Sequence, residues 1–126
     1  MVLPRFIAAA KAGEPLKVFG DGAQSRCFGF VHDVVEALVR LQKCDAARGE
    51  IFNIGGTEEV SILELARLVV ETLGAKSKIE LISYDQAYAP GFDDMRRRKP
   101  LVEKLERFVK FKPETTLRDI IRLTAG

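Results

Sequence analysis

Two groups of arginine side chains in this sequence are suited to binding phosphate. Arg26 follows the glycine turn Gly20–Gly22, and the basic run 96–99 precedes Pro100 in a stretch without clear periodicity. The planar guanidinium of arginine can donate two parallel hydrogen bonds to a phosphate, which lysine cannot reproduce. Both groups, converging near an aromatic side chain such as Phe19, would form a clamp for a nucleoside diphosphate. The alternative is that the run 96–99 is an ordinary solvated surface.

The other residue types exclude most metal and cofactor chemistry. His32 is the single histidine, which is too few for a zinc site and leaves no basis for a Ser-His-Asp triad. Cys27 and Cys44 stand in unrelated contexts and are predicted to be reduced, buried thiols. The glycines at 20–22 and 55–56 lack the three-glycine spacing that places a pyrophosphate on a helix N-terminus. We therefore predict no metal site and no bound cofactor on this chain.

Length and composition indicate one ordinary globular domain. The chain has 126 residues, 47% hydrophobic and 30% charged, as in folded rather than disordered proteins. The net charge of +2 argues against nucleic-acid binding through bulk charge. No run of about 18 apolar residues occurs, so we expect no membrane span. Residues 1–12 lack the pattern of a secretory signal, and we expect a cytoplasmic protein.

Hydrophobic periodicity predicts a mixed α/β unit. A first helix is expected from Leu3, Phe6, Ile7 and Ala10, ending at Gly13. Strands are expected at residues 16–19, 27–31, 51–54 and 78–84. The turn at 20–22 is predicted to join the first two strands as a hairpin. The glycine pair 55–56 is predicted to link the third strand to a helix. Together these elements predict one compact unit in which helices outnumber strands.

Capping signals locate the later helices. Asp33 with Glu36, and Ser61 with Glu64, match the capping box that opens a helix. The second helix is expected to end at Gly74. The apolar faces predicted for these two helices are Val34, Ala37, Leu38 and Leu41, and Ile62, Leu65, Ala66, Val69 and Leu73. An irregular stretch is expected at residues 85–99, in which Asp93 and Asp94 hold part of the basic run. Pro100 is expected in the first turn of a helix bearing Leu101, Leu105 and Phe108, and a final helix near Thr116 bears Leu117, Ile120 and Ile121.

Several short motifs occur in a familiar order along the whole chain. They are Leu3-Pro4-Arg5-Phe6-Ile7, Gly20-Asp21-Gly22 with Arg26, Phe30-Val31-His32-Asp33, Phe52-Asn53-Ile54-Gly55, Ser61-Ile62-Leu63-Glu64-Leu65 and Arg96-Arg97-Arg98-Lys99-Pro100. In this order they resemble the extended short-chain dehydrogenases/reductases, a family of NAD-dependent nucleotide-sugar epimerases, dehydratases and decarboxylases. UDP-glucose 4-epimerases and UDP-glucuronate decarboxylases are the members that the chain resembles.

The resemblance implies that residues 1–126 are a single C-terminal, nucleotide-sugar-binding domain. In the family this region follows a Rossmann half, which carries the glycine-rich NAD loop and a catalytic Tyr-x-x-x-Lys pair. No Tyr-x-x-x-Lys pair occurs here, since Tyr84 is followed four residues on by Tyr88, and Tyr88 by Phe92. The expectation is therefore a chain without catalytic residues of its own, inactive alone, and without NAD, which the full-length family uses.

The resemblance also assigns substrate-binding positions. Val2 matches a position that touches uridine, and Lys17 and Phe19 lie on the strand that flanks the base. Arg26 matches the arginine of the Gly-Asp-Gly-x-x-x-Arg segment that binds the diphosphate, and Arg98 matches the second phosphate-binding arginine. The implied ligand is a UDP-sugar or a dTDP-sugar. Without the family, Phe19 would more often be a core residue.

The sequence departs from the family pattern at two places. Leu101 stands where many relatives have an aspartate, so a contact from that aspartate is not expected here. Lys110-Phe111 stands where the family has Gly-Trp, which is a milder change at a packing position.

Partner predictions follow from the implied absence of the Rossmann half. The helix from Asp33 and the strand 51–54 would then expose apolar faces and an unpaired edge, so the chain is expected to form a homo-oligomer. The competing class is a non-enzymatic interaction module that binds an acidic partner through the loop 96–99.

Overall fold

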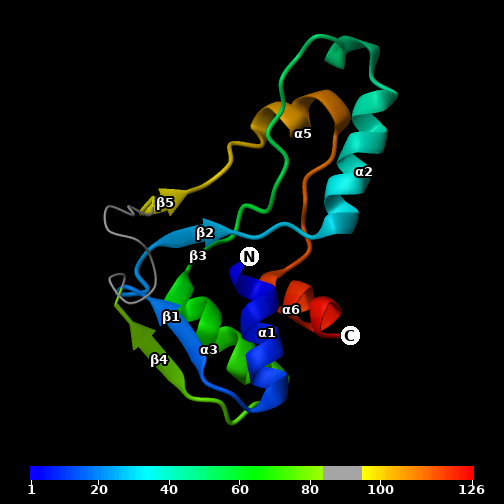
Figure 1. The fold of residues 1–126 in the computed structure, drawn as a ribbon. Helices are drawn as coiled ribbons and strands as arrows, with labels where there is room; N and C mark the ends of the chain where they lie inside the picture. The colour runs from blue at the N-terminus through cyan, green and yellow to red at the C-terminus, as the bar shows by residue number, and fades with distance from the viewer. Residues whose placement is uncertain (84–94) are drawn as a thin grey trace. The chain divides into compact units, whose positions relative to one another are not determined.

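The computed structural model describes residues 1–83 and 95–126, and the chain forms two compact units (Figure 1). The first unit is built from residues 1–26, 60–98 and 118–126, and the second from residues 27–59 and 99–117. Tyr84, residues 85–94 of the predicted irregular stretch 85–99, and with them the proposed anchors Asp93 and Asp94, lie outside the described residues. The residues assigned to substrate all lie in the first unit.

The first unit has a core of helices packed against a short sheet. Its elements are α1 (Val2–Ala12), β1 (Leu16–Phe19), β2 (Ser25–Cys27), α3 (Ile62–Leu73), β4 (Ile79–Ile82), β5 (Arg97–Arg98) and α6 (Leu117–Ala125). Both α1 and α3 contact β1, and they contact each other. The core contains Leu16, Val18, Leu65, Val69 and Ile121, all with 0% of their surface exposed. The predicted first and last helices and the first strand are confirmed.

The strands pair in two separate sheets, and this overturns the predicted hairpin. β1 pairs in parallel with β4, whereas β2 lies between β3 (Glu59–Ser61) and β5. β1 and β2 therefore do not pair across the turn. Gly20 and Gly22 have positive φ angles of 67° and 68°, as predicted for a glycine turn. This turn directs the chain from one sheet into the other instead of folding β2 back onto β1.

Helix α3 begins and ends where its sequence predicts. The Ser61 hydroxyl accepts the Glu64 N–H at 3.1 Å, and Glu64 Oε2 accepts the Ser61 N–H at 3.1 Å. Gly74 ends the helix in the left-handed conformation, with φ of 61°. The hydroxyl and N–H of Ser61 hold the pKa of Glu64 below its ordinary value. The predicted capping box is confirmed in full.

The second unit contains α2 (Val31–Gln42), a 3-10 turn η1 (Asp45–Ala47) and α5 (Glu103–Val109). The predicted cap at Asp33 is wrong, because α2 begins at Val31 and its N-cap is Phe30, three residues before Asp33. The Asp33 carboxylate instead accepts the N–H of Thr115 at 3.2 Å. A long-range partner has thus replaced the local capping contact that the spacing suggested. Of the predicted inner face of α2, Ala37 is buried, while Leu38 is 53% exposed.

Three further predictions, two of strands and one of a helix start, are wrong. Residues 51–54 are not a strand, and Ile51 is 86% exposed. Of the predicted strand 27–31, Cys27 alone is in β2 and Val31 already begins α2. Pro100 precedes α5 by three residues instead of lying in its first turn, and Leu101 is 70% exposed. Hydrophobic runs and a proline were therefore insufficient to define these elements.

An aromatic cluster holds the 50–54 segment against α5. The Phe52 and Phe108 rings meet edge to face, with centroids 5.1 Å apart. Lys104 Nζ lies 4.9 Å from the Phe52 centroid and 2.5 Å from Glu50 Oε2. Lys104 lowers the pKa of Glu50 through this contact. The segment is therefore fixed by side chains and not by a strand ladder.

Both cysteines are free thiols, and each is half-buried instead of buried as predicted. Among the described residues, none of the helices has the length and apolar character required to cross a bilayer.

Candidate functional site

The two arginines predicted to converge lie side by side on neighbouring strands. In the parallel pair β2–β5, Arg26 is the register partner of Arg98, and Ser25 is the partner of Arg97. Adjacent strands lie about 4.8 Å apart, and register partners project from the same face of the sheet. Arg26 is half-buried and Arg98 is exposed. This register places the two arginine side chains on the same face of neighbouring strands.

Arg26 also holds β5 in place. Its Nη1 donates to the carbonyl oxygens of Ser25 and Met95, each at 2.7 Å. The Ser25 N–H donates to the Arg96 carbonyl at 2.8 Å. Because Met95 and Arg96 directly precede β5, these bonds fix the approach of that strand to β2. Arg26 is therefore oriented by backbone acceptors before any ligand is considered.

Lys17 and Phe19 lie on the face of β1 opposite to the core. Leu16 and Val18 are fully buried, and side chains alternate along a strand, so Lys17 and Phe19 point to the other face. The strand β4 places Glu80 beside Lys17. Lys17 is exposed and Phe19 is half-buried. Phe19 is therefore not a core residue, which was the alternative interpretation of its sequence position.

Arg5 is a neighbour of Phe19 that the sequence did not indicate. Its guanidinium carbon lies 5.2 Å from the centroid of the Phe19 ring, within the range of a cation–π interaction. Val2 precedes Arg5 by three residues on α1, and residues three apart share a helix face. The first turn of α1 thus presents Val2 and Arg5 together. The sequence could not indicate this contact, because it joins a helix to a strand and no regular spacing of residues predicts such a pair.

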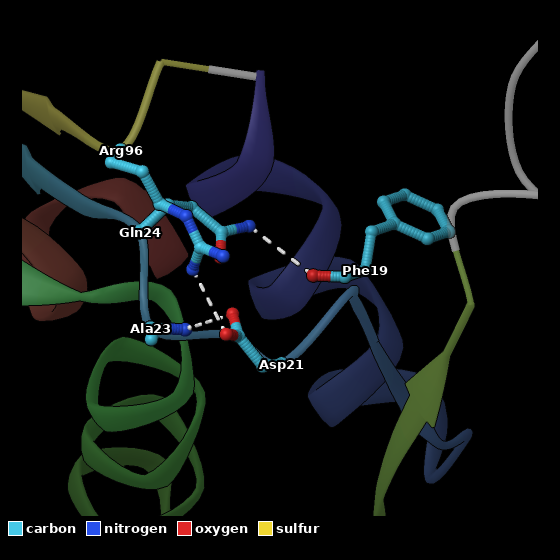
Figure 2. A network of polar contacts seen from close by, with 5 residues as sticks. All are labelled: Phe19, Asp21, Ala23, Gln24 and Arg96. Atoms are coloured by element: carbon cyan, nitrogen blue, oxygen red, sulfur yellow. Dashed lines mark hydrogen bonds and ion pairs between the residues drawn. The ribbon is translucent and has the colours of Figure 1, made fainter. Parts of the chain in front are cut away.

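The turn between β1 and β2 is linked to the basic run through Asp21 (Figure 2). Asp21 Oδ2 accepts a hydrogen bond from Arg96 Nη1 at 2.9 Å, and Oδ1 accepts the Ala23 N–H at 2.9 Å. The hydrogen bond from Arg96 is the main cause that holds the pKa of Asp21 below its ordinary value, followed by that from Ala23. Gln24, buried at 5% exposure, donates from Nε2 to the Phe19 carbonyl at 3.2 Å.

The basic run 96–99 is therefore not a uniform loop. Arg96 pairs with Asp21, whereas Arg97 and Arg98 form β5. The sequence attributed the anchoring of this run to Asp93 and Asp94, which lie outside the described residues. Asp21 was missed as a partner because it is remote in the sequence and belongs to a turn that was interpreted only through its glycines.

The Gly20–Gly22 turn is not shaped as a cradle for a dinucleotide. A Cβ at Gly22 would lie 2.7 Å from Val18 Cγ1 and 2.9 Å from Leu63 Cβ. The glycine therefore permits close packing within the protein, and the space beside it is already filled. The residues present do not fit a pyrophosphate of NAD at this turn, in agreement with the missing third glycine.

The single histidine packs against an aromatic ring. The His32 and Phe30 ring centroids are 4.8 Å apart, and His32 is exposed at the start of α2. In the described part of the chain, no three His, Cys, Asp or Glu side chains come together as a metal site would require.

Comparison with known proteins finds similarity to parts of several longer proteins. Residues 1–55 match the model of the NAD dependent epimerase/dehydratase family. The chain is also similar to part of nucleotide-sugar decarboxylases and epimerases.

Individual relatives show how much of such a protein the chain spans. It is 41% identical over 115 residues to UDP-N-acetyl-alpha-D-glucosaminuronate decarboxylase of Bacillus cytotoxicus, covering 91% of this chain and 36% of that protein. Its fold matches an epimerase from Methanothermobacter thermautotrophicus with a TM-score of 0.87 and 25% identity, over 99% of this chain and 36% of that one. A UDP-glucuronic acid 4-epimerase from Bacillus cereus, solved with UDP-glucuronic acid and NAD, matches with a TM-score of 0.85 and 25% identity, over 99% and 38% of the two chains. The chain therefore spans little more than a third of these relatives.

Proposed function

We propose that residues 1–126 are the C-terminal, substrate-binding region of an NAD-dependent nucleotide-sugar epimerase, dehydratase or decarboxylase. In this proposal Arg26 and Arg98 bind the diphosphate of a UDP-sugar or dTDP-sugar. The observation that carries the proposal is the register pairing of these two arginines in β2 and β5. Its support from relatives is the homology to UDP-sugar enzymes, including one solved with UDP-glucuronic acid and NAD.

The charge arrangement favours an anion with two phosphates. Two adjacent guanidinium groups repel each other, and a diphosphate between them neutralises both with charge-assisted hydrogen bonds. Arg26 is held by two carbonyl oxygens, so little side-chain entropy remains to be lost when a phosphate binds. Arg26 held in this way, with Arg98 beside it, is proposed to bind a diphosphate better than a single phosphate.

The remaining assigned residues belong to the nucleoside end of the proposed ligand. Phe19 offers a ring face and edge for the base, and Arg5 covers part of that ring. Lys17 lies on the same strand face, and Val2 lies on the same helix face as Arg5. We propose that these side chains contact the base and ribose, with uridine favoured over thymidine.

The contribution of this region to catalysis would be positioning. Holding the diphosphate fixes the sugar, and correct placement of a substrate can supply several kcal/mol of catalysis. The Tyr-x-x-x-Lys pair of the family has no counterpart here, so the chain alone is proposed to be inactive. NAD would be supplied by the Rossmann half of the full-length enzyme.

Calorimetric titration with UDP, dTDP and NAD tests this proposal. Binding of UDP or dTDP, weakened at least about tenfold by Arg26→Ala and by Arg98→Ala, is expected. Arg67→Ala, at an exposed arginine of α3, is the matched control and should leave affinity unchanged. NAD should give no heat. Equal binding of UDP by wild type and both site variants would rule out the proposed clamp.

The alternative function is a non-enzymatic module that binds an acidic partner through residues 96–99. The exposure of Arg97, Arg98 and Lys99 favours it. Such a module would bind poly-glutamate and UDP alike, with affinity falling steeply as salt rises. Discrimination between UDP and inorganic phosphate at constant ionic strength separates the two functions.

A further inference from the structure

Strand β5 consists of Arg97 and Arg98 alone, which is shorter than strands usually are. So short a strand gains little from its own ladder, and contacts outside it must hold it in register. Besides the ladder bond from the Ser25 N–H to the Arg96 carbonyl, two such contacts are present: Arg26 Nη1 to the Met95 carbonyl, and Arg96 Nη1 to Asp21 Oδ2.

The turn that bears Asp21 is fixed to the start of α3. The carbonyl of Gly22 accepts the Leu63 N–H, and the carbonyl of Gln24 accepts the Ile62 N–H, each at 3.0 Å. These bonds satisfy N–H groups that a helix N-terminus otherwise leaves unpaired. Because Gly22 is also closely packed on Val18, the Asp21 backbone has little freedom to move.

The Asp21 side chain is fixed as well. One carboxylate oxygen accepts the Ala23 N–H, which leaves the other directed at Arg96, as Figure 2 shows. The carboxylate is therefore oriented by its own turn, and Arg96 is the partner that depends on it. The position of β5 therefore depends on the turn at Asp21, and not the reverse.

We propose that Asp21 and Arg96 are positioning residues whose ion pair anchors β5 and so keeps Arg98 beside Arg26. The expected effect on ligand binding rests on the proposed function, in which the arginine pair is the diphosphate clamp. Asp21 and Arg96 themselves do not contact the ligand. They determine whether the second arginine stands where both phosphates can be reached.

The expected effect is small, since both side chains are more than half exposed. Exposed ion pairs contribute at most about fivefold to an equilibrium. Asp21→Asn and Arg96→Gln should each weaken UDP binding about two- to fivefold, with only a small fall in the melting temperature. The double exchange Asp21→Arg with Arg96→Asp should recover part of the affinity, because it restores the opposite charges.

Two control variants separate anchoring from net charge. Glu14→Gln removes an exposed carboxylate from the same unit, and Arg67→Gln removes an exposed cation of α3 without touching the turn. Glu14→Gln should change UDP affinity less than Asp21→Asn does, and Arg67→Gln should change it less than Arg96→Gln does. In 1 M NaCl, Asp21→Asn and wild type should converge, because salt screens an exposed pair.

The second readout is hydrogen exchange at the Ser25 amide, which reports on docking of Arg96 without any ligand. Asp21→Asn and Arg96→Gln should accelerate it about two- to fivefold relative to wild type, and the two controls should not. Unchanged Ser25 exchange in both variants would overturn the proposal, whatever UDP does. Faster exchange in both variants, together with a wild type that binds no UDP, would support the anchor and refute the diphosphate clamp.

Discussion

Arg26 and Arg98 are register partners on neighbouring parallel strands, although they come from distant parts of the chain. Two like charges side by side on a sheet are unfavourable without a counter-ion. The protein tolerates this pair by docking Arg26 on backbone carbonyls and by anchoring the other strand through Arg96. Like charges held side by side are typical of binding sites, where residues that bind a ligand can lower the stability of the free protein.

Replacing Arg98 should therefore have opposite effects with and without UDP. Arg98→Gln removes the repulsion and should raise the free energy of unfolding by up to about 1 kcal/mol without ligand. UDP at 100 times its Kd should stabilise the wild type by about 2.7 kcal/mol, and the variant much less. Thermal unfolding at both conditions measures this. An unchanged UDP-induced shift in Arg98→Gln would contradict the role of this arginine.

The Asp21–Arg96 pair should persist at low pH. Arg96 and the Ala23 N–H lower the pKa of Asp21 in the folded protein, so the carboxylate stays charged below its ordinary titration range. The stability from this pair is present above the unfolded pKa and is lost as the pH falls through the folded pKa. NMR titration of the Asp21 carboxyl should give a higher pKa in Arg96→Gln than in wild type. Identical values in the two proteins would show that the pair does not form in solution.

Lys110 is a position where glycine should stabilise the second unit. It ends α5 with φ of 52° and is the single non-glycine residue with positive φ in the described ranges. A left-handed conformation costs a non-glycine residue about 1–2 kcal/mol. Glycine avoids this cost, but it also makes the unfolded chain more flexible, which offsets part of the gain in stability. Lys110→Gly should thus add about 0.5–1 kcal/mol to the free energy of unfolding. Lys112→Gly, which lacks the positive φ, should be neutral or destabilising in the same urea titration.

The outer face of α2 should mediate self-association. Val31, Val35 and Leu38 are 61%, 50% and 53% exposed, and they recur at the i, i+4, i+7 spacing of a helix-packing stripe. We expect the wild type to associate as its concentration rises, and Val35→Glu with Leu38→Glu to abolish this. Lys43→Glu adds a carboxylate away from the stripe and should leave association intact. Light scattering that finds the wild type monomeric at every concentration would exclude this interface.

The sequence by itself determined the elements whose signals are local. The Ser61–Glu64 capping box, the left-handed glycines Gly13 and Gly74, and the spacing of Leu3, Phe6 and Ile7 define α3 and α1 because cap and face contacts reach four residues at most. The sequence also indicated arginine as the residue type of the proposed clamp, since the ability of arginine to bind phosphate does not depend on the fold. The resemblance supplied the choice of Arg26 and Arg98 among many basic residues.

Tertiary structure alone decided how the strands pair and which distant residues meet. The hairpin at Gly20–Gly22 and the cap at Asp33 failed because partners remote in sequence replaced the predicted local contacts. The strand 51–54 failed because its side chains, and not a strand partner, fix the segment. The same remoteness concealed the contacts of Arg5 with Phe19 and of Arg96 with Asp21. Hydrophobic periodicity specifies which face of an element is buried, but not which element covers it. Arg26 could thus be identified from the sequence, while its place beside Arg98 required the fold.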